Sequence, residues 1–129
     1  MGTCCASDYR NSENTKTLFS IFDSEPSVKI HKKAKVTWKD IGPFPLDNLL
    51  QENYIAINVH LKIIQRDEVV NNEQYYGQVD NKGKKKGIGR LCIPQQGMYE
   101  GEFNKDQIHG FGRYIYPTYE YYEGFWKNG

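Results

Sequence analysis

The stretch YEGEFNKDQIHGFGRYIY, residues 99–116, decides the fold because it holds two short runs of alternating character on either side of a polar turn. Successive side chains of a β-strand point to opposite faces of the sheet. In the first run this alternation separates an aromatic and glycine face from an acidic face: Tyr99, Gly101 and Phe103 against Glu100 and Glu102. Residues 112–116 alternate in the same way. The stretch therefore predicts a β-hairpin with one aromatic face.

The pattern repeats along the chain with a period of 23 residues, and fixed-period identity is the signature of a repeat architecture. Seven identities share this period: Gly87/Gly110, Gly89/Gly112, Arg90/Arg113, Pro94/Pro117, Tyr99/Tyr122, Glu100/Glu123 and Gly101/Gly124. We therefore expect a mainly β, antiparallel hairpin array over residues 75–129, with units at about 75–98 and 99–121 and a partial unit at 122–129.

Two of these segments resemble the MORN repeat family. The resemblance rests on the residues 99–103 and 109–114, and on Tyr122-Glu123-Gly124-Phe125-Trp126-Lys127-Asn128-Gly129. It is weakest in the first unit, where Val79 stands in place of an aromatic residue and Leu91-Cys92-Ile93 in place of Tyr-x-Tyr. The resemblance implies an antiparallel meander and a role in membrane-proximal, cytoskeletal or ciliary scaffolding.

The chain before residue 75 carries neither the 23-residue period nor the MORN motif. Residues 1–45 mix polar residues with scattered single hydrophobes, so we expect this segment to be largely disordered. Residues 46–72 form an amphipathic segment that is expected to cap the array. Its apolar positions fit a helical stripe and, over residues 55–63, strand alternation equally well. Helix is the favoured prediction, and strand remains the alternative.

Composition narrows the classes of function. The formal net charge is only +1 among 26% charged residues, which gives no reason to expect binding to nucleic acid. No apolar run reaches the roughly 18–20 residues that span a bilayer, and the first residues do not resemble a signal peptide. Cys4 and Cys5 are adjacent and Cys92 stands alone, which suits reduced thiols. We therefore expect a cytoplasmic protein.

The first residues nevertheless suggest lipidation. Removal of Met1 would expose Gly2 for N-myristoylation, and Cys4 and Cys5 lie where palmitoyl groups follow a myristoylated glycine. Two acyl chains anchor a protein stably, whereas one binds only marginally. Two groups of basic residues are candidates for contact with anionic phospholipid, in which each cation contributes about 1 kcal/mol: Lys32, Lys33 and Lys35, and Lys84, Lys85 and Lys86.

No motif predicts catalysis, and no cofactor or metal ligand set is expected. The pairs Gly87/Gly89 and Gly110/Gly112 lack the third glycine and the following helix of a phosphate loop. The acidic residues of the repeats are expected to be solvated: Glu100, Glu102, Glu120 and Glu123. Gly112 is expected to lie under an aromatic ring from the adjacent strand, which would offset the cost of glycine in a strand.

These observations predict a non-catalytic scaffold or adaptor at the inner face of a membrane. Its repeats would bind a protein partner, an anionic lipid, or both, through the exposed face of the sheet. The sequence ends midway through a repeat, at Gly129, which suggests a fragment, with a natural cap as the alternative. The alternative function is therefore the regulatory front of a larger enzyme, since MORN repeats precede some lipid kinase and SET-type methyltransferase domains.

Overall fold

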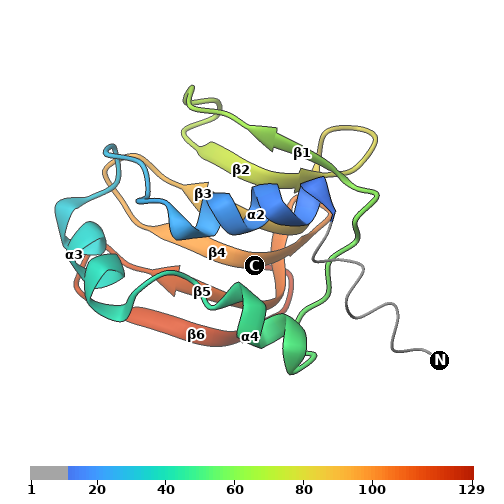
Figure 1. Cartoon of the computed structure of the whole chain (residues 1–129). Coiled ribbons are helices and arrows are strands. Elements are labelled where there is room, and N and C mark those ends of the chain that lie inside the picture. Colours follow the sequence, from blue (N-terminus) through green and yellow to red (C-terminus); the bar gives the residue numbers. More distant parts are fainter. Residues whose placement is uncertain (1–11) are drawn as a thin grey trace.

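The structure, a computed structural model, describes residues 12–129 and is built around one six-stranded sheet. The strands pair in chain order, each antiparallel to the next, which makes a meander (Figure 1). They are β1 (Lys62–Gln65), β2 (Gln74–Val79), β3 (Lys85–Cys92), β4 (Met98–Asn104), β5 (Gln107–Ile115) and β6 (Tyr121–Trp126). The predicted mainly β, antiparallel repeat array is confirmed.

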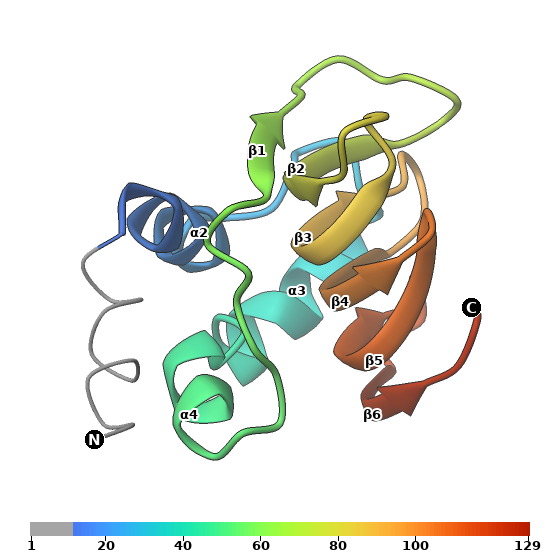
Figure 2. The same ribbon diagram turned by 90° about the vertical axis from the view of Figure 1, so that its right-hand side faces the viewer.

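Within residues 12–129, three helices precede the strands, and all three lie on one side of the sheet (Figure 2). They are α2 (Glu13–Asp23), α3 (Lys32–Ile41) and α4 (Leu46–Gln51). Ser12 caps the start of α2, because its hydroxyl oxygen accepts hydrogen bonds from the backbone N–H groups of Asn14 and Thr15. The Nδ1 atom of His31 caps α3 by accepting from the N–H of Lys33.

The prediction of disorder over residues 1–45 is wrong for residues 12–45. Leu18, Ile21 and Phe22 lie on one face of α2, and they are buried in one cluster with Ile88 and Phe111 of the sheet. A short amphipathic helix is marginal alone and is stabilised mainly by the surface against which it packs. The single hydrophobes of this segment are therefore enough to stabilise the helix, because the sheet provides the surface against which they pack.

The prediction of a helix over residues 46–72 is also wrong for most of its length. Only Leu46–Gln51 is helical, and Asn53 then takes a left-handed backbone conformation with φ of 63°. The chain next runs along the helical layer without regular structure and forms β1, which pairs with β2. The first edge of the array is therefore covered by a strand rather than by a helix.

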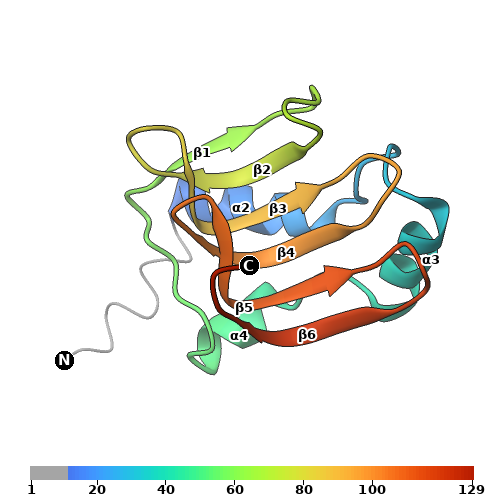
Figure 3. The ribbon, with the colours of Figure 1, turned by 180° about the vertical axis from the view of Figure 1, so that it is seen from behind.

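The opposite face of the sheet carries the rings of Tyr75, Tyr99 and Phe103, and no helix of the described residues covers it (Figure 3). Ring contacts confirm the predicted aromatic face of the hairpin and extend it to β6: Tyr99 contacts Phe103, Tyr114 and Trp126, and Tyr114 contacts Tyr116. The second strand of the unit starts earlier than the expected residue 112. The turn is tight, with Lys105 and Asp106 at φ of 50° and 70°, so β5 begins at Gln107.

A tyrosine and two glycines form the core of each hairpin. The Tyr99 ring covers Gly112, since a Cβ added there would lie 2.0 Å from the tyrosine hydroxyl oxygen. The same hydroxyl donates to the Glu102 carbonyl at 2.9 Å, across the irregularity between Gly101 and Phe103. Burial raises the pKa of Tyr99, so the hydroxyl stays protonated and remains a donor. The prediction that a ring covers Gly112 is confirmed.

The expectation that Glu100 is solvated is wrong. Its side chain is 0% exposed, beneath the helices, and its two oxygens accept from Arg90 and Arg113 at 2.8 Å each. Both arginines also donate to carbonyls of the helical layer, Arg90 to Phe22 and Ser24 and Arg113 to Gly42. This triad therefore joins three adjacent strands and ties the helices to them.

Glu102 is half-buried rather than fully solvated. Its Oε1 atom accepts from the backbone N–H of Phe111 at 2.8 Å, and burial raises the pKa of its carboxyl group. Glu120 and Glu123, by contrast, are exposed as expected. Alternation assigns the acidic residues to one face correctly, but the helices and neighbouring strands decide which of them meet water.

Candidate functional site

The free edge of the sheet is the first candidate for a binding surface. β6 pairs with β5 on one side only, and no strand of the described chain pairs with its other side. An unpaired edge presents a row of backbone N–H and C=O groups that can pair with another strand. At the opposite edge, β1 is short, with only four residues.

Large apolar side chains gather around β6. Phe125 is 64% exposed, and its ring packs edge-on against Phe111 and near Tyr54. Tyr122 is 46% exposed, whereas Tyr99, the equivalent residue one repeat earlier, is fully buried. The group consists of Tyr54, Tyr116, Tyr119, Tyr121, Tyr122 and Phe125. Clustered exposed apolar residues on a soluble domain are typical of an interaction surface.

The cross-strand pairing of arginine with glutamate also ends at this edge. Glu123 lies one repeat after Glu100 and opposite Arg113, but the arginine pairs with Glu100 instead. Glu123 is exposed and forms no ion pair with any residue that the structure describes. The Glu123 carboxylate is therefore exposed at β6, whereas Glu100, one repeat earlier, has an arginine on both sides.

The six predicted lysines do not form one patch. Lys32, Lys33 and Lys35 lie on α3, whereas Lys84, Lys85 and Lys86 lie at the β2–β3 turn, at the other end of the molecule (Figures 1 and 3). A single flat membrane contact would thus use one group or the other.

Several of these lysines are already engaged. Lys85 pairs with Glu73 at 2.6 Å and with Asp106 at 3.5 Å, and its ammonium lies over the Tyr75 ring. Lys35 donates to the Val28 carbonyl, and Lys33 lies over the Tyr119 ring. The remaining members, Lys32, Lys84 and Lys86, are exposed. They are the ones that a lipid headgroup could reach without breaking an internal contact.

The predicted lipidation residues Gly2, Cys4 and Cys5 lie outside the described residues. Cys92 is buried, and burial raises the pKa of its thiol, which disfavours the reactive thiolate. Among residues 12–129, no group of His, Cys, Asp and Glu could hold a metal ion. None of the helices in that range is long and apolar enough to cross a membrane.

The comparison with protein families agrees with the geometry. Residues 99–121 and 122–129 match the family model of the MORN repeat. The chain carries MORN repeats. The MORN repeat is a non-catalytic repeat, found in scaffolds that bind membranes or proteins. No curated protein matches the chain.

The segment before the matched residues has the same architecture as the MORN units. The Tyr75 ring covers Gly89 as the Tyr99 ring covers Gly112. The Tyr75 hydroxyl donates to the Gln78 carbonyl, and the Gln78 side chain accepts from the N–H of Ile88, as Glu102 does from Phe111. By geometry, residues 75–98 therefore form a further unit of the array.

Sequence reasoning missed the triad of Arg90, Glu100 and Arg113. The signal was present, because arginine and glutamate both recur at 23 residues on neighbouring strands. The register pairs Arg90 with Glu100 and Glu100 with Arg113 directly across the sheet. Opposite charges in that relation predict a cross-strand ladder, whether or not the face is solvated.

Proposed function

We propose that the chain is a non-catalytic scaffold or adaptor that binds a protein partner through the β6 edge of its MORN array. The observation that carries the proposal is the β6 edge, which no strand of residues 12–129 covers, with its exposed rings, Tyr122 and Phe125 above all. A partner strand that pairs with β6 would gain main-chain hydrogen bonds there, and the rings would give it apolar contact.

The residues along the β6 edge also indicate which residues a partner strand would carry. In the register between β4 and β5, Gly101 lies opposite Gly112 and Glu100 opposite Arg113. The equivalent residues of β6 are Gly124 and Glu123. A strand with glycine followed by arginine or lysine would lie flat under the Tyr122 ring and neutralise Glu123. Rim charges of this kind favour one register and orientation over others.

Phe125→Lys is expected to weaken partner capture by about tenfold or more, since losing an aromatic hot spot costs about 2 kcal/mol. The matched control is Val70→Lys, which changes another exposed apolar residue, 45% exposed, at the β1–β2 turn. Proteins captured from a eukaryotic cell extract by the wild type and both variants would be quantified by mass spectrometry. Equal capture by Phe125→Lys and the wild type, with both variants folded, would refute the β6 site.

The proposal places the scaffold at the inner face of a membrane. The sequence support is the glycine at position 2 with the cysteines at 4 and 5, and the structural support is the exposed lysines on α3 and at the β2–β3 turn. Anionic phospholipid is the proposed second ligand, because lysines near a leaflet add to the affinity of acyl chains.

Gly2→Ala is expected to release the protein from membranes in a eukaryotic cell, because the myristoyl group requires that glycine. Replacing Cys4 and Cys5 by alanine should weaken retention while leaving transient binding, because one acyl chain alone is marginal. The measurement is the membrane fraction after sedimentation. An unchanged membrane fraction for Gly2→Ala would contradict the anchoring proposal and leave the β6 site unaffected.

A further inference from the structure

One end of the sheet brings together the β2–β3 turn, the β4–β5 turn, the start of β1 and the end of β6 (Figure 3). The strand register fixes this arrangement. Lys62, at the start of β1, pairs with Val79, where β2 enters its turn, and Trp126, at the end of β6, pairs with Gly110 near the start of β5. We call this the basic end, because six exposed lysines lie on it: Lys62, Lys82, Lys84, Lys86, Lys105 and Lys127.

The carboxylates of the two turns are bound within the turns themselves. Asp80 accepts from two backbone N–H groups of the β2–β3 turn, at 2.8 and 3.0 Å. Asp106 accepts from the backbone N–H of Lys85 at 2.9 Å. The Lys85 ammonium in turn pairs with Asp106 and with Glu73. Lys85 is therefore balanced inside the molecule, whereas the six exposed lysines of the basic end face outward.

Positive charge is concentrated at the basic end. Its seven lysines meet four carboxylates, those of Glu73, Asp80, Glu102 and Asp106, which leaves an excess of three positive charges. Glu13 and Lys16, near the start of α2, pair with each other, and counting Glu52 after α4 still leaves an excess of two. Asp8 and Arg10 cancel, so residues 12–129 have a formal net charge of +1 and the remainder carries a negative excess.

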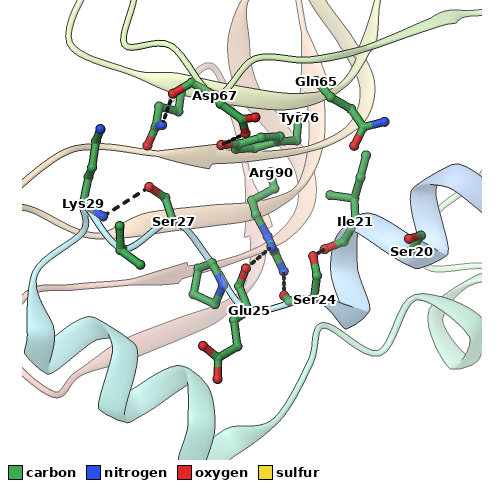
Figure 4. A pocket seen from close by; sticks show the side chains of 13 residues that line it. Ser20, Ile21, Ser24, Glu25, Ser27, Lys29, Gln65, Asp67, Tyr76 and Arg90 are labelled. Atoms are coloured by element: carbon green, nitrogen blue, oxygen red, sulfur yellow. Dashed lines mark hydrogen bonds between the residues drawn. The ribbon is translucent and has the colours of Figure 1, made fainter.

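The lysines on and before α3 are matched by carboxylates or engaged by other groups. Lys39 pairs with Glu25 at 3.6 Å. Lys29 borders a cavity of about 590 Å³ whose lining also contains Glu25 and Asp67 (Figure 4). Two lysines of α3 contact a carbonyl and an aromatic ring, as described above. Of the two predicted groups of lysines, the group at the β2–β3 turn therefore lies on the more strongly basic surface.

The described part of the chain also begins at the basic end. Asn14, in the first turn of α2, donates through Nδ2 to the carbonyls of Val59 and Leu61 at 2.8 and 3.1 Å. Leu61 directly precedes Lys62 of β1, so the start of α2 lies beside this end of the sheet. An acyl anchor attached before Ser12 would therefore join the molecule at its basic end rather than at α3.

We propose that the basic end lies against a surface of anionic phospholipid, with the strands steep to the plane of the bilayer. A flat surface reaches all six exposed lysines, because six strands about 4.8 Å apart spread the turns over about 24 Å. A single soluble headgroup reaches only some of them. The inference rests on the proposed membrane location and adds the orientation: the β6 edge runs away from the bilayer and stays open to a protein partner.

The test is co-sedimentation of the full chain, purified without acyl groups, with vesicles of phosphatidylcholine alone or mixed with phosphatidylserine. The wild type is expected to bind only the mixed vesicles. Lysines near an anionic leaflet each add to the affinity, so losing three should weaken binding by about tenfold or more. The variant that removes them replaces three residues of the β2–β3 turn together: Lys82→Gln, Lys84→Gln and Lys86→Gln.

The matched control removes three exposed lysines from the α3 side: Lys29→Gln, Lys32→Gln and Lys39→Gln. It changes the net charge equally and should leave binding within about twofold of the wild type, because charges beyond a Debye length of about 10 Å are screened. Equal weakening by the two triple variants would overturn the assignment to the basic end. Equal binding to vesicles with and without phosphatidylserine would overturn it as well.

Two further arms distinguish a flat surface from a headgroup held by one turn. Lys105→Gln with Lys127→Gln changes the neighbouring turn and the end of β6, and should weaken vesicle binding about threefold or more. Soluble glycerophosphoserine should not displace the protein from the vesicles. An unchanged affinity for the double variant, or displacement by glycerophosphoserine, would show that the β2–β3 turn alone binds a headgroup and would overturn the proposed orientation.

The orientation and the anchor fail separately. Release of Gly2→Ala from cell membranes, with no effect of the β2–β3 triple variant on vesicle binding, would overturn the orientation and leave the anchor. Retention of Gly2→Ala, with vesicle binding lost in the triple variant, would refute the anchor and support the basic end. Capture of a protein partner through β6 should be unchanged in the triple variant.

Discussion

Glu100→Gln is expected to destabilise the protein by about 3–5 kcal/mol, because removing one partner from a buried ion pair leaves an uncompensated charge. Here two guanidinium groups, those of Arg90 and Arg113, would lose their shared carboxylate at a position that is 0% exposed. Glutamine is nearly isosteric, so the loss would report charge rather than volume. A domain stable by only about 5–15 kcal/mol would lose a large part of its stability.

The matched control is Glu123→Gln, the same substitution at the equivalent residue one repeat later. Glu123 is exposed, so its substitution should alter stability by no more than about 0.5 kcal/mol. Urea denaturation of the three proteins gives both differences. Similar midpoints for Glu100→Gln and Glu123→Gln would mean that water or another group neutralises the arginines, and that the triad does not hold the sheet and helices together.

Gly112→Val is expected to cost about 1–3 kcal/mol, although valine has the higher strand propensity. A Cβ at this position would lie 2.0 Å from the Tyr99 hydroxyl oxygen and 2.2 Å from the ring carbon that bears it. The ring has little room to move, because it is fully buried and its hydroxyl donates to the Glu102 carbonyl. Overpacking should therefore outweigh the gain in propensity.

Gly124→Val is the control for that prediction. The Tyr122 ring also lies over a glycine, Gly124, which is two residues further along the same strand, but Tyr122 lies on the edge strand and is 46% exposed. Its ring can turn toward solvent, so the cost should be clearly smaller than at Gly112. Thermal or urea denaturation would compare the two, and a neutral or stabilising Gly112→Val would show that the ring does not require glycine.

The repeat units could be predicted because their determinants are local. Tyr99, Gly101 and Gly112 occupy fixed positions within one hairpin, and period-2 alternation assigns their face without knowledge of the rest of the chain. The helices α2 and α3 could not be predicted in this way. Leu18 and Phe22 become a helix face only against the sheet, and nothing in their own neighbourhood indicates that surface.

The candidate sites also differ in whether the local sequence predicts them. The β6 strand with Tyr122 and Phe125 follows from the repeat pattern, since residues 122–126 repeat residues 99–103 one period later. The cavity of about 590 Å³ brings Glu25, which follows α2, together with Asp67 and Gln74 of the β1–β2 hairpin, and only the tertiary fold joins these two segments. Spacing along the chain carries no record of that proximity, so the cavity was not predicted.

The buried triad also bears on how such an array can change in length by duplication of a gene segment. Each 23-residue period brings one arginine and one glutamate, as Arg90 and Glu100 are followed by Arg113 and Glu123. Inserting or deleting a whole period therefore adds or removes one positive and one negative charge, leaves the net charge of the interior unchanged, and moves the unmatched carboxylate to the new last strand. An insertion shorter than one period would move the arginine and the glutamate out of their cross-strand register. One buried charge would then have no partner. Repeat number should accordingly vary in whole units among descendants of such a chain.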